Sequence, residues 1–356
     1  MKKIILIAIL FTFLFSFNSI YAEDKSFDPN STTIAKLQET ALNNSRQALI
    51  DDVDIKGKEM AIRTVRSDAN AMSDSILSVT KPMGVQLDLD VAKKAKQDHL
   101  NQLSVDVYKT ALNIQLCNKE IELKQYKLAV AEDKFGMVKA RFKASVITQD
   151  TLDSAQYDID SSNVDLSNSK EKLNSLFLEL KKLLNQPLYA TAVTITDKLN
   201  LAIIKEVELN SALENLYKTE TTVYSAENKL NIAQTAMDIA AKLYVKGNLS
   251  YDNSVIDLDE AKLNYEAAKA ALDVKVKNKY NDVLNSKDDV ELACKYAELA
   301  KKKLVNAQTK YNKGTITKEA YLDAQVAQRE AEYTKLSTIV SFNEVNAEFE
   351  NIVGQK

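Results

Sequence analysis

The chain has 356 residues, 45% hydrophobic and 27% charged, with only 6 Gly, 3 Pro and no Trp. Sandwiches and open α/β sheets need many turns, so this shortage of Gly and Pro argues against them and favours long helices. The 47 basic and 50 acidic residues give a net charge of −3. They are intermixed along the chain, so no basic face indicates a nucleic-acid partner.

The N-terminus has the pattern of an export signal. Lys2 and Lys3 precede an apolar run from Ile4 to Phe17, and Ala22 directly precedes two acidic residues. This pattern predicts a signal peptide of residues 1–22 and an exported mature chain. The alternative is an uncleaved membrane anchor, for which the apolar run is short.

Six helices are predicted for the mature chain, and the breaks between them are marked by Pro, Gly or polar residues. The expected ranges are 31–79, 90–143, 149–185, 203–244, 252–312 and 318–352. The first helix is expected to end at Lys81-Pro82-Met83-Gly84, because proline interrupts a helix. The β-prone stretch Tyr189–Thr196 is expected to contain a short strand.

The second and third predicted helices share a repeat of 3.5 residues. Mostly apolar residues step by three and four positions from Ile114 to Phe142, and again from Leu152 to Leu183. This repeat is the seam of a left-handed coiled coil. Only Lys143–Thr151 separates the two segments, so they are predicted to fold back as an antiparallel hairpin.

The last two predicted helices repeat this arrangement with an alanine-rich seam, from Ala293 to Tyr311 and from Ala320 to Ala331. The helix that ends at Tyr311 is expected to be about 80 Å long at 1.5 Å per residue. A single hairpin of that length buries only one stripe of each helix. Partner helices, and therefore an oligomer, are expected.

Matching residues indicate an internal duplication. Phe142–Thr148 aligns with Tyr311–Thr317 at an offset of 169, and Ala155-Gln156 aligns with Ala324-Gln325 at the same offset. Near the start of each half, Leu42-Asn43-Asn44 matches Leu209-Asn210-Ser211 at an offset of 167. We therefore predict two repeats, residues 23–188 and 189–356.

Few residues have the spacing of a catalytic or metal site. His99, the single histidine, is interpreted as a surface residue, and Asp88-Leu89-Asp90 as the N-cap of the second helix rather than a metal pair. Cys117 and Cys294 are too few for a disulfide framework and are interpreted as buried free thiols. Without a phosphate loop, metal-ligand spacing or nucleophile elbow, the sequence predicts a protein that is not an enzyme and uses no cofactor.

The duplicated motif resembles that of the TolC-like outer membrane efflux proteins. In the second half the similar residues are Tyr311, Gly314, Thr317, Leu322, Asp323, Ala324 and Gln325. In the first half they are Phe142, Thr148, Leu152, Ala155 and Gln156, preceded by the family-like helix Ala41-Leu42-Asn43-Asn44. The likeness covers most of the mature chain.

The resemblance implies an all-α protomer of long antiparallel coiled-coil helices in two repeated halves, three copies of which form a hollow α-barrel. The two hairpin turns would form the tip that opens and docks to a periplasmic adaptor (membrane fusion protein) and an inner-membrane pump. The docking residues implied are Ser145, Thr148, Asp150, Gly314, Thr315, Thr317 and Asp323. Gly314 suits a tight turn because it can adopt positive φ; Ser145 occupies its place in the first half, so a different turn is expected there.

The sequence departs from the family where strands of a transmembrane β-barrel are expected. The corresponding places hold only Ile76–Gln86 and Leu243–Ser254, which are too short for a pair of membrane strands. We therefore expect a protomer that lacks the transmembrane β-barrel, lies in the cell envelope and associates with a membrane only indirectly.

The leading hypothesis for function is an efflux or export duct across the cell envelope, a homotrimeric tube that works with an adaptor and a pump. The alternative is a non-transport coiled-coil scaffold of the envelope. A periplasmic adaptor is a weaker third hypothesis, because the β-rich segments that flank an adaptor's hairpin are not visible in the sequence.

Overall fold

The computed structural model describes residues 31–69, 74–188, 193–203 and 207–354. The predicted signal peptide lies outside these ranges. The elements, in order, are β1 (Ser31–Thr32), α1 (Ile34–Asn43), α2 (Arg46–Ala69), α3 (Ser75–Lys143), α4 (Gln149–Leu183), β2 (Thr194–Ile195), α5 (Leu209–Thr219), α6 (Thr221–Leu243), α7 (Leu249–Asn312) and α8 (Lys318–Val353).

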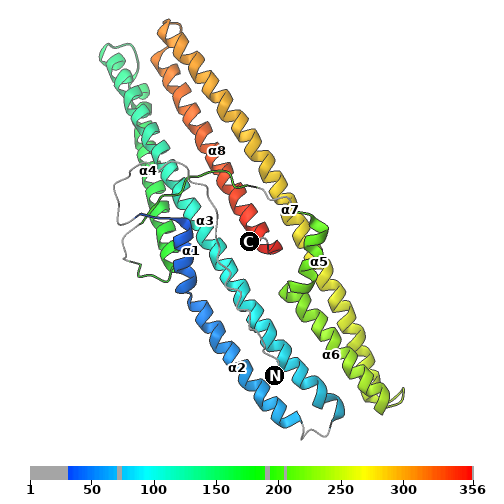
Figure 1. Ribbon diagram of the computed structural model, residues 1–356. Coiled ribbons are helices and arrows are strands. Elements are labelled where there is room, and N and C mark those ends of the chain that lie inside the picture. Colours follow the sequence, from blue (N-terminus) through cyan, green and yellow to red (C-terminus); the bar gives the residue numbers. More distant parts are fainter. Residues whose placement is uncertain (1–30, 70–73, 189–192, 204–206, 355–356) are drawn as a thin grey trace, which may run out of the picture.

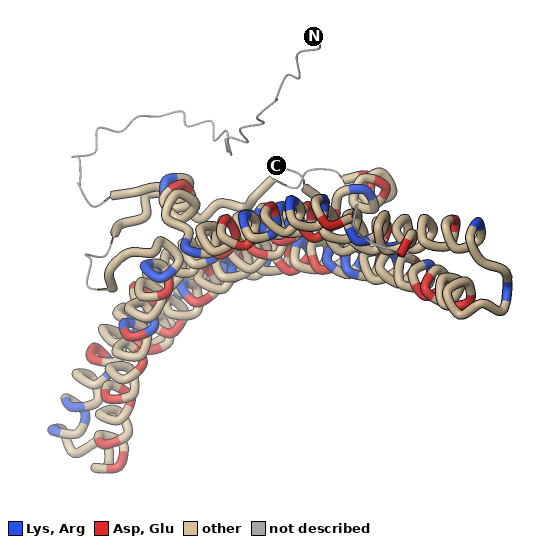
Figure 2. Tube along the Cα trace, turned by 90° about the horizontal axis from the view of Figure 1, so that it is seen from below, with Lys and Arg blue, Asp and Glu red and all other residues tan. Residues whose placement is uncertain are grey.

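The helices form a single layer, which Figure 1 shows from its face. The long helices α3 and α7 run through its whole length. Across the upper half of the view the order is α4, α3, α8 and α7, and across the lower half it is α2, α3, α6 and α7, in agreement with the helix contacts. The helices α2 and α4 therefore form one edge of the layer and α7 forms the other. Seen from below, the layer is arched (Figure 2).

In each of the two long hairpins, α3–α4 and α7–α8, a coiled-coil seam holds the two helices together. On α4, the predicted seam positions Leu166, Ser169 and Leu180 are buried. In the second hairpin, Ala297 and Ala300 of α7 pack with Ala331 of α8. The predicted all-α fold of antiparallel hairpins is confirmed, and α3, at 69 residues, is about 100 Å long at 1.5 Å per residue.

The hydrophobic core lies at mid-length in two clusters, the first mainly of residues from the first half together with Val340 of α8, and the second of residues from the second half. The first includes Val107 of α3 and Leu180 of α4, and the second includes Val276 of α7 and Phe342 of α8. The strands β1 and β2 pair in parallel beside the first cluster, with Thr32 opposite Ile195. The short strand predicted in the 189–196 stretch is thus confirmed at 194–195, while residues 189–192 lie outside the described ranges.

Proline does not end the first helix as predicted. The expected break at 81–84 is wrong, because α3 runs through Pro82 without interruption. A proline removes one backbone donor, and a helix of this length keeps nearly all its other hydrogen bonds. The helix begins at Ser75, where the carboxylate of Asp74 accepts hydrogen bonds from the backbone N–H of Ile76 and Leu77 at 2.8 and 2.9 Å.

This longer α3 overturns a second prediction. Asp88 and Asp90 lie inside the helix and do not form an N-cap. Asp90 instead accepts a hydrogen bond from the side-chain amide of Gln86, one turn earlier, at 3.1 Å.

The first predicted helix comprises α1, α2 and the start of α3, and the fourth is divided into α5 and α6. The fourth is divided at Glu220, whose carboxylate caps α6 by accepting a hydrogen bond from the Val223 N–H at 2.9 Å. The first residues of α1 and α5, Ile34 and Leu209, are separated by 175 positions. The match at an offset of 167 was therefore wrong, because residues 42–44 lie at the end of α1 and residues 209–211 at the start of α5.

Both cysteines are free, as predicted. Cys117 is buried and donates its S–H to the Ser169 carbonyl at 3.4 Å, and burial raises the pKa of the thiol. Cys294 is only partly buried. Within the described ranges, no helix is long and apolar enough to cross a membrane.

Candidate docking tips and subunit edges

The two hairpin turns have the same backbone conformation. After α3, the N–H of Ser145 donates to the Phe142 carbonyl at 2.8 Å and the next N–H donates to the Arg141 carbonyl at 3.0 Å. After α7, the equivalent bonds made by Gly314 and Thr315 measure 2.8 and 2.9 Å. This pair of bonds is the Schellman motif, which places one residue in the left-handed region. The φ angle is 59° at Ser145 and 70° at Gly314, so the expectation of a different first turn was wrong.

Threonine begins the returning helix of each hairpin. Thr317 caps α8 by accepting a hydrogen bond from the Ala320 N–H at 3.1 Å. Thr148 is the N-cap of α4, and its hydroxyl lies 3.1 Å from the Thr151 hydroxyl. Asp150 lies in the first turn of α4, where the helix dipole favours a carboxylate.

The predicted docking residues thus gather at two tips, which lie at the same end of the molecule (Figure 1). Thr315 also supports its own turn, because its hydroxyl donates to the Lys310 carbonyl at 2.9 Å. Apart from Asp323, the predicted docking residues lie in or directly beside the turns, and Val146 between them is 72% exposed.

Asp323 has a different role, because it lies in a charged seam between α3 and α8. Its carboxylate pairs with the Lys134 ammonium at 2.5 Å. Other pairs in this seam, from the tips toward mid-length, are Arg141–Glu319, Lys127–Glu330, Asn113–Glu344 and Lys109–Glu348. From Lys134 toward mid-length, successive pairs are separated by the same number of residues on α3 as on α8, as antiparallel packing requires. Each exposed pair adds little stability, but together they align the two hairpins.

An uncharged hydrogen-bond chain joins the hairpins in the same region. Tyr126 of α3 donates its hydroxyl to the Gln325 side-chain carbonyl at 3.0 Å, and the Gln325 amide donates to the Tyr321 hydroxyl at 2.9 Å. The Tyr321 ring stacks on Tyr311 with centroids 5.0 Å apart. Gln325, Tyr311 and Asp323, which the duplicated motif singled out, therefore connect helices as well as marking the turn.

Sequence reasoning did not find these cross-hairpin pairs, because their partners lie roughly 200 positions apart along the chain. One signal was present: Lys127, Lys134 and Arg141 recur every seven residues on α3. A repeat of basic residues at this spacing marks one side of a coiled-coil helix.

A partly buried charged cluster joins three helices at mid-length. Both Lys109 of α3 and Lys279 of α7 donate to the Glu348 carboxylate of α8, at 2.5 and 2.7 Å. Burial opposes ionisation of Glu348, but the two ammonium groups hold the pKa of this carboxyl below its usual value. Burial raises the pKa of its neighbour Glu344, which accepts a hydrogen bond from Asn113 at 2.5 Å.

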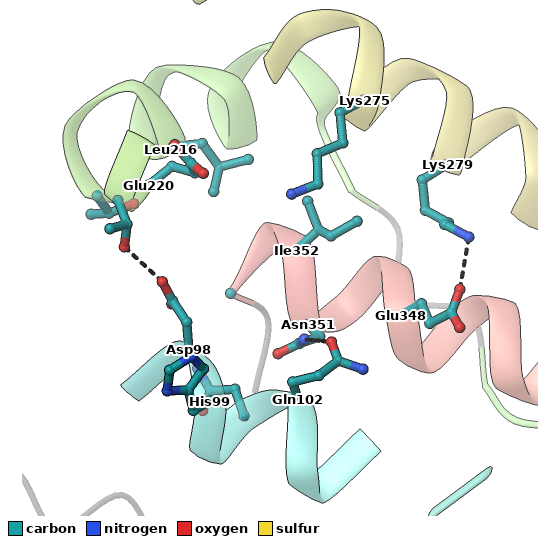
Figure 3. Close-up of a pocket in the computed structure, with 14 residues that line it drawn as sticks. Asp98, His99, Gln102, Leu216, Glu220, Lys275, Lys279, Glu348, Asn351 and Ile352 are labelled. Atoms are coloured by element: carbon teal, nitrogen blue, oxygen red, sulfur yellow. Dashed lines mark hydrogen bonds and ion pairs between the residues drawn. The ribbon is translucent and has the colours of Figure 1, made fainter. Parts of the chain in front are cut away.

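A cavity of about 590 Å³ lies beside this cluster, between α3, α5, α7 and α8 (Figure 3). Polar groups across it bond to one another: Thr221 donates to Asp98 at 2.7 Å, and Asn351 donates to Gln102 at 3.5 Å. His99 lies at its margin and is half exposed, as predicted, but it also pairs with Asp51 of α2 at 2.9 Å. These contacts fasten helices together. In the described part of the chain, no group of acidic, cysteine or histidine side chains could hold a metal ion.

Both edges of the layer carry exposed apolar side chains. On α2, Val53 and Met60 are 69% and 65% exposed, and on α7, Ile256 and Leu263 are 62% and 73% exposed. Each pair is separated by seven residues, the heptad spacing of a coiled-coil seam. Single exposed apolar residues are ordinary, but stripes at this spacing indicate helix faces that lack a partner within one chain.

Comparisons with known proteins agree with this fold. No protein-family model and no curated protein matches the sequence. Among solved structures, a membrane protein from Pseudomonas aeruginosa is similar with a TM-score of 0.72 at 13% identity, over 90% of each chain. The outer membrane protein VceC from Vibrio cholerae gives 0.68 at 12% identity, over 90% of this chain and 96% of that one.

The open-state MtrE outer membrane channel of Neisseria gonorrhoeae gives a TM-score of 0.67 at 14% identity, over 90% of this chain and 88% of that one. At such low identity the likeness shows the fold alone. The resemblance drawn from the motif residues is confirmed at that level: this chain has the fold of TolC-like outer membrane channels.

Proposed function

We propose that this chain is one protomer of an efflux or export duct, a homotrimeric helical tube through which cargo crosses the cell envelope. The protomer contributes an arched section of the wall and performs no chemistry of its own. Residues 1–22 direct its export, and residues 23–188 and 189–356 are the two repeats of the wall. Its association with a membrane is indirect.

The observation that carries this proposal is an arched single layer with two unpartnered edges. A solid bundle would turn its apolar stripes inward, whereas here the edge helices α2 and α7 (Figure 1) expose Val53 and Met60, and Ile256 and Leu263, respectively. Two different edges that pack on one another join copies head to tail, and such contacts close into a ring when the rotation allows it. An arched layer supplies that rotation (Figure 2).

The tips are the proposed docking surface for an adaptor and, through it, a pump. The turn residues Ser145, Thr148, Asp150, Gly314, Thr315 and Thr317 are exposed at one end of the layer. Asp323 contributes by holding α8 against α3 through Lys134. Two hydrogen-bonded turns at the same end of the layer offer a preorganised surface, which lowers the entropic cost of binding.

The test is the solution mass of the exported form, residues 23–356, measured by light scattering without detergent, with particle images of the same sample. The proposal predicts a trimer with a central channel. A monomer, or a compact dimer with no channel, would contradict it and favour a non-transport scaffold of the envelope.

A further inference from the structure

The outward face of α4 is acidic near the tip. Residues 149–169 contain five aspartates and no Lys or Arg. Asp150, Asp153, Tyr157, Asp160 and Val164 step by three and four, so they form one stripe, and all of them are exposed. The positions that face α3, such as Leu166, lie on the opposite side of the helix.

Within the described residues, these three aspartates have no ion-pair partner. The α4 aspartate that does have one is Asp165, which pairs with Lys124 of α3 at 2.6 Å. Asp153 and Asp160 accept hydrogen bonds only from neutral glutamine amides on their own helix, at 2.7 and 3.1 Å. The stripe therefore presents uncompensated negative charge to whatever lies beside this edge.

The outward face of α7 is basic at the same end of the molecule. Residues 295–313 contain six lysines, and Glu298 is the single acidic residue among them. Beside the buried Ala293, Ala297 and Ala300 seam lies an exposed stripe of Leu292, Lys295, Leu299, Lys303, Asn306, Lys310 and the C-cap residue Lys313. In the described chain, none of these lysines forms an ion pair, although α3 and α8 carry many.

The two stripes match in position as well as in charge. Going away from the tip along α4, the positions 150, 153, 160 and 164 are separated by 3, 7 and 4 residues. In the stripe of α7, the positions 313, 310, 303 and 299 have the same separations. The helices run in opposite directions from tips at the same end (Figure 1), so equal steps give equal heights at 1.5 Å per residue. Asp150, Asp153 and Asp160 thus lie level with lysines, and Val164 lies level with Leu299.

We propose that the acidic stripe of α4 packs against the basic stripe of α7 on a second copy of this chain. The pairs are Asp150–Lys313, Asp153–Lys310, Asp160–Lys303 and Val164–Leu299. This inference rests on the proposed ring and adds the surface that joins neighbouring copies at the tip end. Opposite charges on the two edges also exclude wrong pairings, since α4 against α4 or α7 against α7 would place like charges together.

A charge-swap experiment tests the proposal on the 23–356 chain. One variant carries Asp150→Lys, Asp153→Lys and Asp160→Lys; a second carries Lys303→Asp, Lys310→Asp and Lys313→Asp; a third carries all six changes. The matched control carries Glu132→Lys, Lys139→Glu and Lys143→Glu, exposed residues on α3, which lies inside the layer. Circular dichroism verifies that each variant is helical, and light scattering measures its assembly.

We expect each three-residue reversal to weaken assembly by roughly a hundredfold or more, because like charges then face each other. The six-residue swap restores assembly, and the control assembles like the wild type. Raising the salt to about 1 M, where the Debye length is about 3 Å, should weaken wild-type assembly and relieve the reversed variants.

Three outcomes would overturn the inference, and they can be told apart. If all variants form the same ring as the wild type, the stripes do not meet and only the proposed duct remains. If the three-residue reversals abolish the ring and the six-residue swap fails to restore it while staying helical, these residues do not pair as assigned. Absence of a ring in the wild type itself would remove both the inference and the proposed function.

Discussion

The two long hairpins share a backbone and differ on their surfaces. The α3–α4 turn and the α7–α8 turn make the same pair of hydrogen bonds and place one residue at positive φ. Near the tips, however, the outward face of α4 carries aspartates whereas that of α7 carries lysines. The cores differ too, because the first hairpin packs around Leu180 and the second around Phe342.

This difference separates what the fold requires from what assembly uses. A tight helical turn needs a left-handed residue and two carbonyls satisfied, so both hairpins have it. Nothing in one chain requires the outward faces to differ in charge. The opposite charges make sense where each hairpin borders a different neighbour.

Truncating the matched core positions of the two hairpins should have the largest effect. Leu180 of α4 and Phe349 of α8 occupy equivalent places in their helices and are 1% and 3% exposed. Leu180→Ala should lower the free energy of unfolding by about 2–5 kcal/mol and Phe349→Ala by about 3–5 kcal/mol, because each leaves a cavity. Urea denaturation measures both, and losses below about 1 kcal/mol would show that these clusters do not carry the fold.

The neighbouring pair of glutamates should respond unequally. Glu348 of α8 accepts bonds from Lys109 and Lys279, whereas the equivalent Glu179 of α4 is exposed and unpaired among the described residues. Glu348→Gln should cost about 1–3 kcal/mol, because two partly buried lysines lose their counter-charge. Glu179→Gln should change the free energy of unfolding by no more than about 0.5 kcal/mol. Equal effects of the two substitutions would show that the Glu348 cluster does not hold its three helices together.

The same glutamate predicts a pH dependence with a definite sign. Its pKa lies below the ordinary 4.5 in the folded protein, so it contributes stability above about pH 4.5 that is lost as the pH falls through the folded-state pKa. The stability difference between wild type and Glu348→Gln should therefore shrink toward low pH. A difference that stays constant from pH 7 to about pH 3 would contradict the assignment.

The two turn residues should change stability in opposite directions. Gly314→Ala places a Cβ at a φ of 70° and should cost about 1 kcal/mol, whereas Ser145→Gly relieves that strain at a φ of 59° and should add about 0.5–1 kcal/mol. Thermal unfolding of the two variants beside the wild type measures this. A destabilising Ser145→Gly would mean that the serine side chain supports the first turn.

The smallest expected effect lies in the seam between the hairpins. A double-mutant cycle of Lys134→Ala and Asp323→Ala should give a coupling of about 0.2–1 kcal/mol, since Asp323 is largely exposed and solvent screens the pair. Lys143→Ala, at an exposed α3 position, serves as a neutral control. A coupling indistinguishable from zero would show that this pair does not align the hairpins.

Much of the fold could be predicted from the sequence, because coiled-coil seams are local patterns. The 3.5-residue repeat placed α4 and α8 within a residue or two, and the duplicated turns fell where the tips are. Pro82 was misleading because one lost hydrogen bond does not end a helix that is held along its length by neighbours. The true boundary is marked by Asp74, whose carboxylate caps the first turn of α3.

The contacts between hairpins could not be predicted in the same way. Whether Lys134 faces Asp323 depends on how two hairpins align in space, and no local pattern encodes that alignment. Ser145 shows a similar limit, since its serine side chain suggested a different turn whereas the neighbouring hydrogen bonds impose the same one. The charge difference between the outward faces of α4 and α7 was present in the sequence, but its meaning depended on knowing that these helices are edges.

In the proposed ring, the α4 edge of one copy packs on the α7 edge of the next. The most direct test is oxidation of a Val164→Cys, Leu299→Cys variant in which Cys117 and Cys294 are replaced by alanine, followed by denaturing electrophoresis. Contact between positions 164 and 299 of neighbouring copies should give covalent ladders of up to three chains, which neither single-cysteine variant should form. Failure to cross-link while the particle remains oligomeric, or equally efficient cross-linking of the single-cysteine variants, would contradict it.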